Sequence, residues 1–69
     1  MENVEIILNG SPVTLESGMN VSQFLIAKSL HPETVIVEYN GEILKKNKYI
    51  QVVLQDKDCL EIMNFVGGG

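Results

Sequence analysis

Two Asn-Gly pairs, Asn9-Gly10 and Asn40-Gly41, constrain the fold of this 69-residue chain more than any other feature. Asn-Gly is the preferred centre of a two-residue type I′ hairpin because both turn positions need a positive φ. Residues 4–8 alternate with a period of two before the first pair, and residues 35–39 are rich in β-branched and aromatic side chains before the second. The pattern predicts two tight hairpins, with returning strands at residues 13–15 and 42–44.

A single helix is expected between the hairpins, from Val21 to about Leu30. Asn20 is a favourable N-cap, and Gln23 three residues later completes a capping-box pattern. Proline disfavours helical geometry in the residue before it, so His31-Pro32 is expected to end the helix. The face turned toward the core is predicted to comprise Val21, Phe24 and Leu25.

The rest of the chain predicts a loop, a short ordered segment and a final strand. Residues 45–48 are expected to form a solvated basic loop, and residues 49–54 a short strand or a 3₁₀ turn. The Asp56-Lys57-Asp58 turn then leads into a last strand at 59–65. A right-handed crossover through the helix places that strand parallel to the first, at the centre of the sheet. The expected fold is an α+β β-grasp domain over residues 1–65, with a mixed sheet of four to five strands crossed by one helix.

Strand parity predicts which side chains face away from the helix. In the last strand Leu60 and Ile62 point toward the helix, whereas Met63 and Phe65 point away. Ile7 points to the same outer face by the same count. We therefore expect Ile7, Met63 and Phe65 to form an exposed patch that a partner recognises, although apolar residues scattered singly over a surface are also common.

Charge and composition narrow the classes of partner. Nine acidic and five basic residues give a formal net charge of −4, which phosphate backbones repel, so no nucleic acid is expected. A basic protein surface is a better match. We expect no membrane partner, since no segment has the length of a membrane span or the pattern of a signal peptide. A single cysteine fits a reducing compartment, and the protein is expected to be cytoplasmic.

The sequence ends in Val66-Gly67-Gly68-Gly69. Four extended residues reach about 13 to 14 Å, and three glycines make a strip of bare backbone that can thread a narrow channel. We expect residues 66–69 to form a flexible tail that partners thread. A frayed end that happens to be Gly-rich is the alternative.

Residues that suggest catalysis have simpler explanations. Cys59, at the start of a buried strand, is expected to be an inert packing residue. His31 has no second metal ligand at a suitable spacing, and Asp56 and Asp58 are expected to cap their turn. No catalytic residue, no metal site and no cofactor bound by the chain itself are therefore expected.

Together these motifs resemble the ThiS-type sulfur carriers of thiamine biosynthesis, ubiquitin-like β-grasp proteins related to the small subunit of molybdopterin synthase. The resemblance covers essentially the whole chain. It is carried most specifically by Leu8-Asn9-Gly10, the hairpin at 37–43 and Val66-Gly67-Gly68-Gly69. One departure is Lys57, where the family usually has glycine. A positive φ at this position would strain the lysine by about 1 kcal/mol or more.

The resemblance implies a protein substrate, not an enzyme. An E1-like adenylyltransferase of the ThiF type, using ATP and Mg²⁺, would attach AMP to Gly69. Sulfur from a donor such as a cysteine desulfurase would then give a thiocarboxylate, and a thiazole synthase of the ThiG type would take up the sulfur. A carrier for molybdopterin or cysteine synthesis, a ubiquitin-like modifier and a pure binding module stay open as alternatives.

Overall fold

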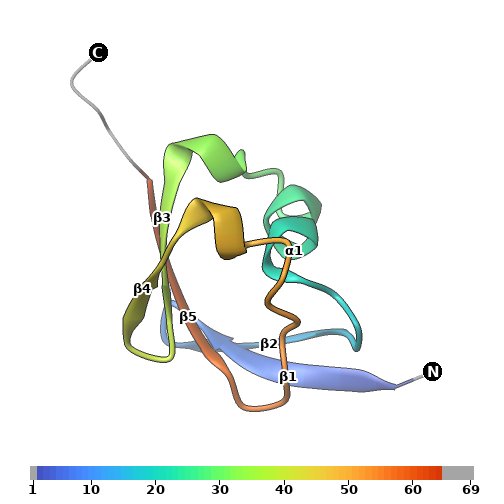
Figure 1. The fold of residues 1–69 in the computed structure, drawn as a ribbon. Helices are drawn as coiled ribbons and strands as arrows, with labels where there is room; N and C mark the ends of the chain where they lie inside the picture. The colour runs from blue at the N-terminus through green and yellow to red at the C-terminus, as the bar shows by residue number, and fades with distance from the viewer. Residues whose placement is uncertain (1, 65–69) are drawn as a thin grey trace.

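The computed structural model describes residues 2–64. Figure 1 shows a twisted sheet with a short helix packed on one side. In chain order the elements are β1 (Asn3–Leu8), β2 (Ser11–Glu16), α1 (Val21–Ala27), a 3₁₀ turn at Pro32–Thr34, β3 (Val35–Tyr39), β4 (Glu42–Leu44), a 3₁₀ turn at Lys46–Lys48, and β5 (Cys59–Asn64).

The sheet has the strand order β2-β1-β5-β3-β4. β5 pairs in parallel with β1, placing Leu8 beside Leu60, and antiparallel with β3, placing Val37 beside Ile62. The two hairpins therefore flank the last strand, and α1 makes the crossover between them (Figure 1). This arrangement confirms the expected β-grasp fold and the central position of the last strand.

Both Asn-Gly pairs form the predicted two-residue turns, joining Leu8 to Ser11 and Tyr39 to Glu42. All four turn residues have positive φ, at 49° and 87° in the first turn and 51° and 90° in the second. A Cβ atom added at either turn glycine would meet nothing within 4 Å. Glycine is therefore favoured there by backbone conformation and not by crowding.

The helix begins as predicted and ends earlier. The Asn20 side chain accepts a hydrogen bond from the Gln23 amide, and the Gln23 side chain accepts one from the Asn20 amide, which completes the capping box. The helix ends at Ala27, not near Leu30. Ser29 has φ 62°, and its amide and that of Leu30 donate back to carbonyls of the last turn. This Schellman-type ending stops the helix before His31-Pro32 is reached.

The core lies between α1 and the inner face of the sheet. The predicted helix face is buried, and Phe24 is its largest member. Burial of each such side chain contributes about 1.5–3 kcal/mol relative to exposure. The buried apolar residues are Ile6, Leu15, Val21, Phe24, Leu25, Val35, Val37, Tyr49, Leu54 and Leu60.

The segment at 49–54 forms no strand of its own. The stretch expected to be a loop contains the 3₁₀ turn at Lys46–Lys48, and the segment at 49–54 follows it. This segment contributes an isolated bridge between Val53 and Asn20. Tyr49 and Leu54 are its buried anchors. Within residues 2–64 no helix is long and apolar enough to span a membrane.

Candidate functional site

The candidate site is the strand that leads toward the C-terminal glycines. β5 is confirmed from Cys59 to Asn64. Phe65 and the predicted partner-threading tail, Val66-Gly67-Gly68-Gly69, lie outside the described residues. The structure therefore defines the base of the proposed tail and the surface around that base.

A buried carboxylate fixes the beginning of β5. Asp58, which is 9% exposed, accepts hydrogen bonds from the hydroxyl of Tyr39 at 2.7 Å and the side-chain amide of Asn40 at 3.2 Å. It also accepts one from the amide of Gln55 at 2.8 Å. A carboxylate taken out of water needs such donors. Asp58 thereby ties the turn before β5 to the β3–β4 hairpin.

Tyr39 has a raised pKa, to which the same contact contributes. Its pKa is raised from 10.0 to about 12, first by burial, then by the hydrogen bond to Asp58 and the negative charge of that carboxylate. The phenol, protonated at neutral pH in any case, therefore stays a hydrogen-bond donor well into the alkaline range.

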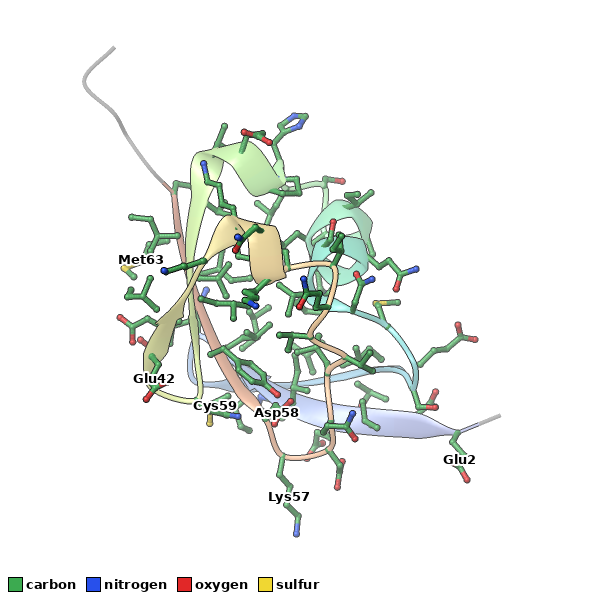
Figure 2. The ribbon with its side chains drawn as sticks, viewed as in Figure 1. Glu2, Glu42, Lys57, Asp58, Cys59 and Met63 are labelled. Atoms are coloured by element: carbon green, nitrogen blue, oxygen red, sulfur yellow. The ribbon has the colours of Figure 1, made fainter. Side chains whose placement is uncertain are left out.

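The other predicted turn residues behave as expected. Oδ1 of Asp56 accepts a 2.9 Å hydrogen bond from the amide of Glu5, so both aspartates cap the turn. Lys57 has φ 74°, in the left-handed region that glycine adopts freely. Its amide donates to the Glu5 carbonyl at 2.7 Å, while its side chain extends from the turn into solvent (Figure 2). The strain expected at Lys57 is therefore present.

Cys59 differs from its predicted setting. It begins β5 but is exposed, not buried as packing. The reason is parity: Leu60 takes the core-facing position, so Cys59 lies on the outer face of the sheet. Within residues 2–64, no cluster of three or more His, Cys, Asp or Glu side chains is placed to hold a metal ion.

The outer face of β5 carries apolar residues in a different grouping from the one predicted. Met63 is 44% exposed and points away from the ribbon in Figure 2. Its neighbour on β3 is Ile36, whereas Ile7 lies beside Cys59, four residues back along β5. Four residues of strand span about 13 Å. Ile7 and Met63 therefore do not adjoin, and Phe65 lies outside the described residues.

A patch of three residues instead covers the β5–β3–β4 side of this face. Met63 and Ile36 are in register, and Ile43 on β4 is in register with Glu38, two residues along β3 from Ile36. Ile43 is 63% exposed. We call Ile36, Ile43 and Met63 the outer-face patch. The alternation of residues 35–39 signals the outward direction of Ile36, but sequence does not reveal which strands are neighbours.

Two acidic side chains lie beside this patch. Glu38 on β3 and Glu61 on β5 are directly opposite each other and share its face. Like charges in opposite positions of a sheet repel each other. A cationic partner group placed between them would relieve this repulsion, in keeping with the negative net charge.

Comparison with known proteins identifies the family. The ThiS family model matches residues 6–69. The chain belongs to the ThiS family. The sulfur carrier protein ThiS of Bacillus subtilis is 44% identical over 63 residues, covering 90% of this chain and 96% of that protein. The match to the ThiS family includes Gly67, Gly68 and Gly69.

Structural comparison agrees with this assignment. The crystal structure of a thiamine biosynthesis protein, ThiS, from Geobacter metallireducens superimposes with a TM-score of 0.81 at 33% identity, over 96% of this chain and all of that chain. The chain also matches a thiazole synthase of Magnetococcus marinus, at 38% identity over 66 residues. It spans only 20% of the length of that relative, and thus aligns with one segment of a larger protein.

Proposed function

We propose that this protein is a sulfur carrier of thiamine biosynthesis, with Gly69 as the residue that carries sulfur. The observation that carries the proposal is the ThiS match running through Gly69, together with the 96% coverage of the Bacillus sulfur carrier. The β-grasp domain supports this role because its central strand, β5, leads toward the glycine segment.

The proposed chemistry takes place at the terminal carboxylate. A carboxylate with a pKa of about 3.3–3.7 is anionic at neutral pH and a poor electrophile. Its oxygen attacks the α-phosphate of ATP in the partner enzyme, pyrophosphate leaves, and Gly69 becomes an acyl-adenylate. The terminal sulfur of a persulfide then displaces AMP to give an acyl disulfide, and a second thiol attacks its S–S bond, which leaves the thiocarboxylate on Gly69 and a new disulfide on the sulfur donor side. ATP and Mg²⁺ belong to the adenylating partner, and the carrier supplies the docking surface and the glycine tail that bears the sulfur.

The proposed partners are an E1-like adenylyltransferase, a sulfur donor such as a cysteine desulfurase, and a thiazole synthase, all in the cytoplasm. A thiazole synthase relative that contains a segment similar to this chain supports the last of these. The outer-face patch with Glu38 and Glu61 suits a docking surface that is apolar with basic residues around it. In this role the protein is a co-substrate and not an enzyme.

Intact-mass spectrometry tests the proposal directly. Protein isolated from cells that require thiamine synthesis should gain about 16 Da, because one carboxylate oxygen becomes sulfur. Deletion of Gly69 should abolish this gain and AMP transfer, and Gly69→Ala should do the same because a methyl group obstructs a tight tunnel. Both variants should retain the unfolding midpoint of the unaltered chain.

Other outcomes assign the protein differently. A conjugate with a lysine of another protein would favour a ubiquitin-like modifier. A thiocarboxylate that a thiazole synthase does not consume would favour a carrier for molybdopterin or cysteine synthesis. A tail that is never modified would leave only a binding module, and normal AMP transfer to Gly69→Ala would refute the tunnel argument.

A further inference from the structure

The two Asn-Gly turns do more than reverse the chain, because each asparagine side chain also binds the backbone of β5. Oδ1 of Asn9 accepts a 2.8 Å hydrogen bond from the amide of Ile62, and Oδ1 of Asn40 accepts a 2.8 Å hydrogen bond from the amide of Cys59. Their main-chain amides donate to β5 as well, Asn9 to the carbonyl of Leu60 and Asn40 to that of Cys59. β5 is thus held by turn residues at its first residue, Cys59, and again at Ile62 in its second half.

A common backbone device explains both contacts. Asn9 and Asn40 have φ of 49° and 51°, so the chain leaves the extended conformation at the first turn residue. In both turns the side-chain oxygen, rather than the main-chain carbonyl, accepts the next hydrogen bond from β5. Asparagine suits this position because it tolerates the left-handed region and carries a short acceptor.

The two contacts differ in what surrounds them. At Cys59, β5 is also fixed by the Asp58 network. Beyond Leu60, however, β1 no longer pairs with β5, and the rows of Met63 and Asn64 are paired with β3 alone. β4 does not reach these rows either, since its pairing with β3 stops at Val37. A two-stranded ribbon is only marginally stable. Within residues 2–64, the Asn9 contact is the last hydrogen bond that β5 receives from the β1 side.

We propose that Asn9 is a positioning residue for the C-terminal tail: its side-chain oxygen holds the Ile62 backbone and thereby fixes the part of β5 that leads toward residues 65–69. This inference rests on the proposed function, in which a partner must receive the carboxylate of Gly69 while gripping the domain. Without the Asn9 contact, the end of β5 has more freedom, and the partner must offset the entropy of ordering it.

Asn9→Gly tests the role of the side chain without altering the turn, because glycine adopts the same positive φ without strain. The variant loses only the Oδ1 acceptor. Asn40→Gly is the control: it has the same turn type and loses the same kind of acceptor at the beginning of β5, together with the hydrogen bond from the Asn40 side-chain amide to Asp58. Asn9→Asp restores an acceptor oxygen at the original position.

Two measurements read these variants. Amide hydrogen exchange should show lost protection at Ile62 in Asn9→Gly and retained protection there in Asn40→Gly and Asn9→Asp. In steady-state adenylation with ATP and the cognate adenylating enzyme, Asn9→Gly should raise the KM for the carrier about three- to tenfold, the equivalent of one lost hydrogen bond. Its kcat should not change, because the tail is intact. Asn40→Gly should leave KM unchanged, and Asn9→Asp should restore it.

The outcomes are separable. An unchanged KM for Asn9→Gly, or an equal rise in Asn40→Gly, overturns the positioning role, because the second result would reflect general loss of stability. Failure of the unaltered chain to accept AMP overturns the proposed function, and this inference with it.

Discussion

The hydroxyl of Tyr39 donates a 2.7 Å hydrogen bond to Oδ2 of Asp58, joining the end of β3 to the turn that precedes β5. Burial, and after it this contact and the charge of Asp58, raises the pKa of Tyr39 to about 12. The contact also gives Asp58 a donor that water cannot fully replace in a partly buried position.

Stability should therefore fall in strongly alkaline solution. The phenol is protonated in both states below pH 10, so its contribution to folding is fully present there. As pH rises from 10.0 toward about 12, the unfolded chain releases this proton before the folded one does, and the contribution is lost. Phenolate absorbance should show Tyr39 titrating near the upper value. The free energy of unfolding should be measured against pH for the unaltered chain and for Tyr39→Phe. The difference between the two curves isolates the contribution of Tyr39 from that of the lysines, and identical curves would contradict the assignment.

Lys57→Gly should stabilise the protein by about 0.5–1 kcal/mol. A non-glycine residue in the left-handed region costs about 1–2 kcal/mol, part of which is offset by the greater entropy of glycine in the unfolded chain. Urea denaturation measures the difference. Lys57→Ala is the control, because it removes the exposed side chain but keeps the Cβ atom that causes the strain. An equal gain from alanine would show that the lysine charge, and not φ, is responsible.

Asn20→Ala should destabilise the fold by about 1 kcal/mol, the usual effect of removing an N-cap. The side chain of Asn20 accepts from the Gln23 amide at 2.7 Å and donates to the Ile50 carbonyl at 3.3 Å, so it caps α1 and ties it to the segment after β4. Asn20→Asp keeps the capping acceptor and should lose much less. If thermal unfolding shows the two variants to be equal, the tie to Ile50 matters more than the cap.

Ile43→Glu should weaken binding to the adenylating partner about tenfold or more, since a charge replaces an apolar contact of the outer-face patch. Ile26→Glu is a closely matched control: both isoleucines are 63% exposed, but Ile26 lies on α1 and not on the outer face of the sheet. Isothermal titration with the partner enzyme distinguishes them, and circular dichroism verifies that both variants fold. Equal weakening by the two substitutions would remove the outer face from consideration as the docking surface.

Local signals in the sequence were sufficient for most of the elements. The Asn-Gly pairs located both hairpins, because few residues other than these accept two consecutive positive φ values. The Asn20 and Gln23 pattern located the start of α1, because a capping box is made within four residues. The end of α1 was missed, since Ser29 carries no strong sequence signal for a left-handed ending, whereas the later proline does.

Tertiary structure alone decided which residues of the outer face meet. Parity gave the outward direction of Ile7 and Met63, but only strand order and register show that Met63 lies beside Ile36 and that Ile7 lies beside Cys59. Tertiary structure also decided that the side chains of Asn9 and Asn40 bind the backbone of β5. Asn9 and Ile62 are 53 residues apart, and their contact exists because the crossover brings β5 back between the two hairpins. Turn and cap chemistry acts over a few neighbouring residues and can be read from sequence, whereas contacts made after chain reversal depend on the packing of the whole domain.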